Sequence, residues 1–150
     1  MGVFCFLIYL SYMKIIITKK QYKLLVYSLL DTITGGKLSF GESDSNNKQW
    51  VEINNFNGDA IMTIFYGKKS CKSPGCKNDL SLSSDFVEDL IKYIPHFRRK
   101  IFSEVMVDYV YDYLGVKCDC IDYNYDDSED SFGYTRFAYN IKKKKRFKFN

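Results

Sequence analysis

The sequence has few of the residues around which catalytic centres are most often built. Its 150 residues include a single histidine, His96, and a single tryptophan. A cysteine–histidine pair would need a cysteine beside His96, and no catalytic signature surrounds any of the five cysteines. A histidine that directly follows Pro95 is more typical of an exposed residue at the start of a helix. The sequence therefore favours a protein that is not an enzyme.

Two common ligand-binding motifs are also incomplete. Residues 34–38 (TGGKL) resemble the end of a phosphate-binding loop, but Leu38 replaces the hydroxyl side chain that binds magnesium. Residues 122–133 begin like a calcium-binding loop. They carry Asp127 at the position of the required glycine and Gly133 at the position of the required glutamate. Neither segment predicts a ligand site.

The features of a secreted protein are missing as well. The chain has no N-x-[ST] sequon, and its start has neither a basic leader nor a small-residue cleavage site. The cysteines are odd in number: Cys5, Cys71, Cys76, Cys118 and Cys120. These features indicate a reducing compartment, so we expect a cytoplasmic protein whose thiols are reduced.

Residues 1–12 (MGVFCFLIYLSY) are almost wholly apolar. The run is shorter than the ~20 residues that cross a bilayer, and Lys14 interrupts any extension. Three interpretations remain open: a buried strand, a marginal membrane anchor, or an artefact of an upstream start codon. We favour the last, because Met13 opens a cleaner beginning in which a strand runs directly into a capped helix.

The composition is that of one folded domain with a basic C-terminus. Apolar residues make up 46% and charged residues 27% of the chain, which is ordinary for a globular protein. The formal charge is +4, but residues 142–148 (KKKKRFK) hold six basic groups, and subtracting them leaves −2. We therefore divide the chain into the apolar segment 1–12, a domain at 13–141 and a basic tail at 142–150.

The tail interleaves basic and aromatic side chains. This pattern suits phosphate contacts combined with base stacking, and it also suits an acidic protein or a membrane surface. A disordered, solubilising end has the same composition. We predict contact with nucleic acid or an acidic partner through eight residues: Lys142, Lys143, Lys144, Lys145, Arg146, Phe147, Lys148 and Phe149.

Capping residues, turn signals and the period of the apolar residues predict the secondary structure. Thr18 and Gln21 form a capping box for a helix at 19–33, and Gly35-Gly36 ends it. Helices interspersed with hairpins favour a single α+β domain, mainly an antiparallel sheet with about three helices packed on one face. The other expected elements are strands at 15–17, 49–53, 60–66, 116–121 and 132–141, helices at 85–94 and 97–114, and a long connection at 67–83. The Asn57-Gly58 turn signal predicts that 49–53 and 60–66 form a hairpin. Asp85 with Glu88 is expected to cap the second helix, and Gly115 to end the third.

Four cysteines form the strongest candidate metal site. Cys71 and Cys76 are four residues apart in a turn-rich loop, and Cys118 and Cys120 alternate along the expected strand at 116–121. Four thiolates could close a tetrahedral structural zinc site, although a C-x2-C spacing is more typical of one. The alternative is that all four are reduced, buried thiols that pack as small apolar side chains. We expect this alternative and therefore no cofactor, and we keep zinc at these four residues as a second hypothesis.

The expected helix at 97–114 is charged against its own dipole. Arg98, Arg99 and Lys100 crowd its positive N-terminus, where an anion could bind. The alternative is that these residues pair with the acidic segment at 119–130. Toward its other end, Glu104, Asp108 and Asp112 form one stripe, which we interpret as a solvated ridge.

The opening KIIITKKQYKLL (residues 14–25) joins a short β-branched strand to a capped helix with Gln at N3. It resembles the start of many small uncharacterised proteins of tailed bacteriophages, although those commonly carry Glu where Lys19 or Lys20 stands here. The resemblance covers these residues alone. It implies a viral origin, a host-cytoplasmic location and a small accessory or structural role, and it transfers no catalytic residue.

Three functional hypotheses follow. The first is a non-enzymatic interaction protein that contacts nucleic acid or an acidic partner through residues 142–149, with Arg98, Arg99 and Lys100 as a second anionic contact. Another is a structural virion or assembly component that binds other proteins. The last is a zinc-stabilised module or small metal-dependent enzyme. A membrane partner is expected only if residues 1–12 anchor the chain.

Overall fold

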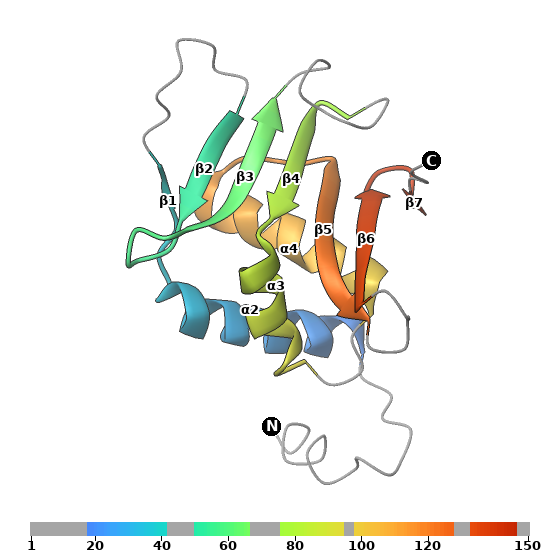
Figure 1. The fold of residues 1–150 in the computed structure, drawn as a ribbon, viewed down its shortest axis with the longest axis horizontal. Helices are drawn as coiled ribbons and strands as arrows, with labels where there is room; N and C mark the ends of the chain where they lie inside the picture. The colour runs from blue at the N-terminus through green and yellow to red at the C-terminus, as the bar shows by residue number, and fades with distance from the viewer. Residues whose placement is uncertain (1–17, 42–49, 67–75, 95–97, 128–132, 147–150) are drawn as a thin grey trace, which may run out of the picture.

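The computed structural model describes residues 18–41, 50–66, 76–94, 98–127 and 133–146, which form a single α+β domain (Figure 1). This confirms the fold class that the sequence predicts. The described helices are α2 (Lys19–Thr34), α3 (Ser84–Ile91) and α4 (Arg99–Leu114). The strands are β1 (Ser39–Phe40), β2 (Trp50–Asn54), β3 (Ala60–Tyr66), β4 (Asn78–Leu82), β5 (Cys120–Asp127), β6 (Gly133–Asn140) and β7 (Lys145–Arg146).

The strands form one seven-stranded sheet in the order in which they occur along the chain. Neighbouring strands are antiparallel, except that β4 and β5 run parallel with Asp79 opposite Cys120 and Ser81 opposite Asp122. A parallel pair needs a long crossover connection. Here α3 and α4 make that crossover, so the two helices follow from the topology of the sheet.

Helix α2 begins and ends as its sequence predicts. The Thr18 side chain accepts a hydrogen bond from the Gln21 amide, and the Gln21 side chain accepts one from the Thr18 amide. At the other end Gly35 has φ +71°, a left-handed conformation that favours glycine. A Cβ on Gly35 would also meet the Phe56 ring, so this glycine lets α2 lie against the β2–β3 loop.

The predicted hairpin at 49–53 and 60–66 is confirmed as β2 and β3. Gly58 has φ +84° in the connecting loop, and the Asn55 side chain accepts hydrogen bonds from the amides of Asn57 and Asp59. The Asn-Gly signal therefore located the turn correctly.

The connection predicted at 67–83 is wrong in its second part, because residues Asn78–Leu82 form β4, a central strand. Its sequence (NDLSL) lacks the β-branched and aromatic residues that mark strands, and pairing with both neighbours stabilises it instead. The following helix is capped by Ser83, whose hydroxyl accepts from the Phe86 amide, and not by Asp85 as predicted.

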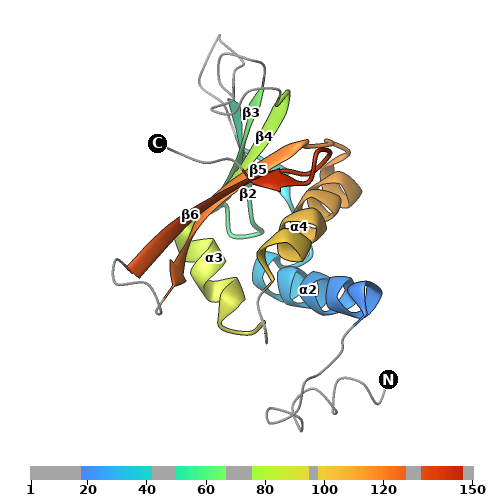
Figure 2. The same ribbon diagram turned by 90° about the vertical axis from the view of Figure 1, so that its right-hand side faces the viewer.

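The core lies between the sheet and the helices. Figures 1 and 2 show α4 crossing behind the sheet in the first view, with α2 alongside it and α3 below the end of β4. The packing of all three helices on one face stays a prediction. Fully buried side chains come from the sheet and from each helix, and they include Ile53, Ile64, Leu80, Ile121, Val26, Leu30, Val87, Leu90, Phe102, Met106, Tyr109 and Val110.

Helices α2 and α4 are joined by a ladder of polar contacts. The three α4 carboxylates that lie four residues apart each bind one α2 side chain. Asp108 and Asp112 are exposed, as the predicted solvated ridge requires, whereas Glu104 is half-buried. The sequence did not show that α2 carries matching groups at the same spacing and runs in the same direction. The pairs are Lys19 with Glu104 at 2.6 Å, Lys23 with Asp108 at 3.3 Å, and the Tyr27 hydroxyl with Asp112 at 2.6 Å.

The predicted strand at 15–17 and the apolar segment 1–12 lie outside the described residues. Within the described ranges, no helix combines the length and the apolar character needed to cross a bilayer.

We predict that the protein loses stability at alkaline pH. Burial raises the pKa of Tyr22 to about 12. Burial, together with the carboxylates that accept their hydroxyl hydrogen bonds, also raises the pKa of Tyr27 and Tyr109 above the usual value near 10. A raised pKa contributes stability that is fully present below about pH 10 and is lost as the pH rises through the folded-state value. Denaturant unfolding between about pH 9 and pH 12 should show this loss.

The Tyr27→Phe variant, which keeps the ring, should lose less stability over the same pH range. An unfolding free energy that stays constant from about pH 9 to pH 12 would contradict the prediction.

Candidate functional site

Part of the predicted basic tail is folded onto the sheet. Strand β7 pairs antiparallel with β6, with Lys145 opposite Asn140 and Arg146 opposite Tyr139, and the chain reverses between them. We call residues 142–146 the basic turn. Its side chains are all exposed. The predicted contacts Phe147, Lys148 and Phe149 lie outside the described residues.

The basic turn has a defined conformation. The Asn140 side-chain carbonyl accepts a hydrogen bond from the Lys143 amide at 2.9 Å. Lys144 has φ +52°, and no other described residue except glycine has a positive φ. A left-handed conformation costs a residue with a Cβ roughly 1–2 kcal/mol. A lysine occupies this position, where glycine or asparagine would fit with less strain.

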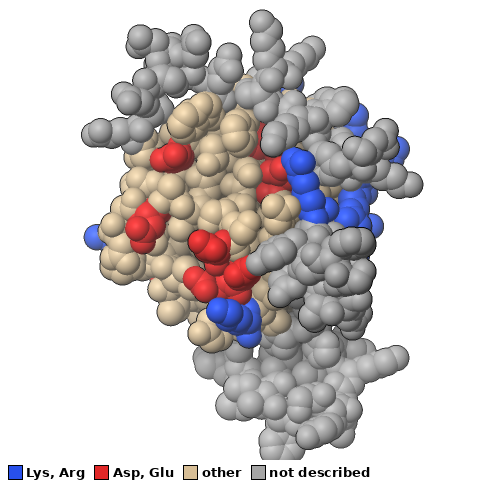
Figure 3. Space-filling view, viewed as in Figure 1, with Lys and Arg blue, Asp and Glu red and all other residues tan. Residues whose placement is uncertain are grey.

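The cations of the basic turn have no acidic partner among the described residues. The salt bridges in the described part of the chain involve Lys19, Lys23, Lys92 and Arg136, none of which belongs to the basic turn. Arg136 binds Asp122 at 3.0 Å. On the face drawn in Figure 3, the largest group of basic residues lies at the upper right, where Figure 1 places β6 and β7. The domain therefore carries a local excess of positive charge at this edge.

The structure brings one predicted second contact close to the basic turn. The guanidinium groups of Arg99 and Arg146 lie 5.7 Å and 5.3 Å from the centre of the same ring, that of Phe137. Such cation–π contacts hold both arginines at the edge of β6. Arg98 is the N-cap of α4 without a side-chain capping bond, and Lys100 is exposed in its first turn. The anion contact predicted for these three residues stays a prediction.

A pocket of about 790 Å³ lies beside the basic turn. Three chain segments meet there: the start of β4, the bend before β5, and the turn after β6. We call this hollow the basic pocket, because four of its lining residues are lysines. The lining consists of Lys77, Asn78, Lys117, Cys118, Asp119, Asn140, Ile141, Lys142 and Lys143.

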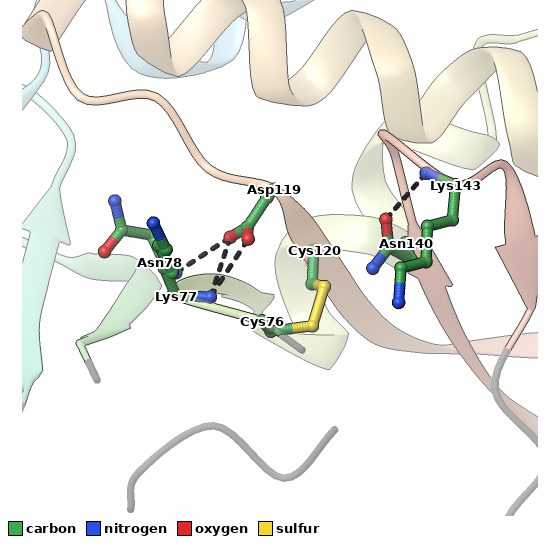
Figure 4. The surroundings of a disulfide bond; sticks show 7 residues. All are labelled: Cys76, Lys77, Asn78, Asp119, Cys120, Asn140 and Lys143. Atoms are coloured by element: carbon green, nitrogen blue, oxygen red, sulfur yellow. Dashed lines mark hydrogen bonds between the residues drawn. A yellow bond between two sulfur atoms is a disulfide. The ribbon is translucent and has the colours of Figure 1, made fainter. Parts of the chain in front are cut away.

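Asp119 holds the three segments of the pocket together (Figure 4). Its carboxylate accepts hydrogen bonds from the backbone amides of Lys77 and Asn78, the shortest at 2.8 Å. Its backbone carbonyl accepts from the Ile141 amide at 2.8 Å, and its amide donates to the Asn78 carbonyl at 3.1 Å. The Asn78 side chain also donates to the Lys117 carbonyl at 3.0 Å. The one carboxylate among the described lining residues is thus occupied by backbone donors.

A disulfide between Cys76 and Cys120 fastens the same corner, with the two Cα atoms 5.9 Å apart (Figure 4). The expected reduced state is therefore wrong for these two cysteines and is confirmed for Cys118, which is buried and forms no disulfide. The physical reason is the parallel pairing of β4 and β5, which places residues from the two distant segments next to each other.

The four predicted zinc ligands do not come together among the described residues. Cys76 and Cys120 form a cluster of their own, whereas Cys118 packs in the main core, and Cys71 lies outside the described ranges. The strand predicted at 116–121 begins only at Cys120, because the chain bends at Asp119, so Cys118 and Cys120 do not share a face. No group of three or more potential metal ligands occurs in the part of the chain described. The zinc hypothesis stays a prediction.

Sequence reasoning missed most of the pocket lining, including Lys77, Lys117 and Asn140. A signal for two of them was present, since Lys77 follows Cys76 and Lys117 precedes Cys118. The zinc hypothesis places the segment around Cys76 next to the segment around Cys118. The same arrangement brings Lys77 close to Lys117.

Comparison with protein-family models, with curated proteins and with solved structures found no match for this chain. The bacteriophage resemblance, the viral origin and the assembly role therefore stay predictions.

We predict that the disulfide stabilises the fold measurably. It closes a loop with a sequence separation of 44 residues, for which the chain-entropy effect is typically about 2–4 kcal/mol. The Cys76→Ser and Cys120→Ser variants should each lose about that much free energy of unfolding, and the double variant should lose no more than either alone. Denaturant titrations without reductant would measure these losses.

Wild-type protein unfolded with a reductant is the matched control and should be as unstable as the serine variants. Equal stability of the wild type with and without reductant, or free thiols at both positions by mass spectrometry, would contradict the assignment.

Proposed function

We propose that this protein is a non-enzymatic nucleic-acid-binding protein that contacts phosphates through the basic turn. The observation that carries the proposal is a run of five consecutive exposed cations, Lys142–Arg146, which has a defined conformation and no acidic partner among the described residues. Lysines and arginines that are not neutralised within a protein are available to displace the counterions of a nucleic acid, which drives binding.

The contrast with α4 supports this interpretation. The acids of α4 are matched by groups of α2 at the same spacing, so these charges are paired within the domain. The five cations of the basic turn have no acidic partner among the described residues. Arg99 extends the positive surface from β7 to the start of α4, because its guanidinium shares the Phe137 ring with Arg146. A strand that follows the turn would therefore reach a second cation.

Binding should be strongly salt-dependent. With four to six phosphate contacts, log affinity should fall against log salt concentration with a slope of roughly −3 to −5. Replacing Lys142, Lys144 and Lys145 by Gln should weaken binding and make this slope shallower by roughly 2 to 3. Fluorescence anisotropy with single- and double-stranded DNA at several salt concentrations would measure both effects.

The matched control replaces Lys20, Lys37 and Lys92 by Gln, which removes the same charge from exposed positions outside the basic turn. It should change the slope little. Equal effects of the two triple variants, or no binding at low salt, would overturn the proposal. Binding to polyglutamate without binding to DNA would assign the turn to an acidic protein partner.

The conformation of Lys144 allows binding to be separated from folding. The Lys144→Gly variant should keep or slightly raise the stability, by at most about 1 kcal/mol, because glycine adopts a positive φ without strain. It should nevertheless bind DNA more weakly, since one phosphate contact is lost. Thermal unfolding and the same anisotropy assay would test both expectations.

Lys142→Gly is the control, because its backbone has no positive φ. It should weaken binding similarly and should not gain stability. A Lys144→Gly protein that binds as tightly as the wild type would show that this side chain makes no contact.

A further inference from the structure

The basic pocket has properties that an exposed run of lysines lacks. Its four lysines come from three separate segments that surround one hollow, so their charges can converge on a single group. Among the described lining residues the one acid is Asp119, whose carboxylate is already bound by two backbone amides. The net charge of these lining residues is therefore positive, and a ligand that binds there should be an anion.

A second observation comes from Asn140. Its side chain is only 2% exposed and yet lines the pocket. The carbonyl oxygen of this side chain is occupied by the Lys143 amide, whereas its NH₂ group donates no hydrogen bond to a described residue. This NH₂ group can therefore donate a hydrogen bond to an oxygen of an anionic ligand in the pocket.

The frame of the pocket is cross-linked by hydrogen bonds and by a disulfide. The Asp119 hydrogen bonds tie its three segments together, and the Cys76–Cys120 disulfide fastens two of them next to the lining. The volume of about 790 Å³ is within the range of small-molecule sites and exceeds what one phosphate group would fill. The space therefore fits a phosphate together with the nucleoside that carries it.

We propose that the basic pocket binds the phosphate monoester of a nucleotide, presented by the phosphorylated end of a nucleic-acid strand or by a free mononucleotide. A monoester carries a charge of about −1.5 to −2 at neutral pH, whereas a phosphodiester within a strand carries −1 and continues on both sides. A pocket surrounded by four lysines suits the greater negative charge of the monoester better. Lys142 and Lys143 belong to both the pocket and the basic turn, so a strand along the turn would end in the pocket. In this respect the inference rests on the proposed function.

The experiment compares short single-stranded oligonucleotides that differ only in their ends, with a 5′-phosphate, a 3′-phosphate or hydroxyl groups alone. The wild type should bind one phosphorylated form more tightly, on the order of tenfold. Replacing Lys77 and Lys117 by Gln should reduce this preference to about one and leave binding of the hydroxyl-ended oligonucleotide nearly unchanged, because both lysines lie outside the basic turn. The triple variant of the turn is the matched control and should weaken binding of every oligonucleotide.

Calorimetry with adenosine monophosphate, and with adenosine as its control, separates the two sources of the monoester. Monophosphate binding that depends on Lys77 and Lys117, without any DNA binding, would support the pocket with a free nucleotide as its ligand and overturn the proposed function. DNA binding without an end preference, together with no monophosphate binding, would overturn the pocket and leave the proposed function standing. Thermal unfolding of the Lys77→Gln, Lys117→Gln variant should match that of the wild type, since both side chains are exposed.

Discussion

The parallel pairing of β4 with β5 is the contact on which the rest of the structure depends. It joins the first four strands to the last three, and it does so across the two helices of the crossover. Asp119 and the Cys76–Cys120 disulfide secure this pairing at its upper end in Figure 1. Without it, the two antiparallel parts of the sheet would share no hydrogen bonds.

The same pairing creates the candidate site. Lys77 and Lys117 lie at the starts of two segments that become neighbours only because their strands pair, and β6 brings the basic turn to the same end of the sheet. One carboxylate, that of Asp119, organises the backbone there and is thereby occupied. A cluster of cations can then remain beside it without internal neutralisation.

Several charges elsewhere in the domain have a structural use. The carboxylates of α4 bind side chains of α2, and Asp31 accepts hydrogen bonds from Tyr109 and Tyr113 at 2.9 Å and 2.6 Å. These contacts fix the relative position of the two helices, although each exposed ion pair contributes only about 0–1 kcal/mol. The five consecutive cations of the basic turn, by contrast, have no acidic partner among the described residues.

Local sequence signals determined much of the fold. The capping box at Thr18, the left-handed Gly35 and Gly115, and the Asn57-Gly58 turn were all identified correctly, because each depends on residues within one turn of the chain. The basic character of residues 142–146 was equally evident, since the charge of a side chain follows from its residue type alone.

Only the tertiary structure decided the rest. Strand β4 has no strand-like composition, and its neighbours in the sheet stabilise it. The sequence could not show that Cys76 would meet Cys120, that Asp119 would bind backbone amides, or that Asn140 would be buried beside four lysines. Each of these depends on contacts between segments tens of residues apart, and no local pattern specifies such contacts. The sequence by itself thus determined where the helices end and where the charge lies, and the pairing of distant strands decided what that charge surrounds.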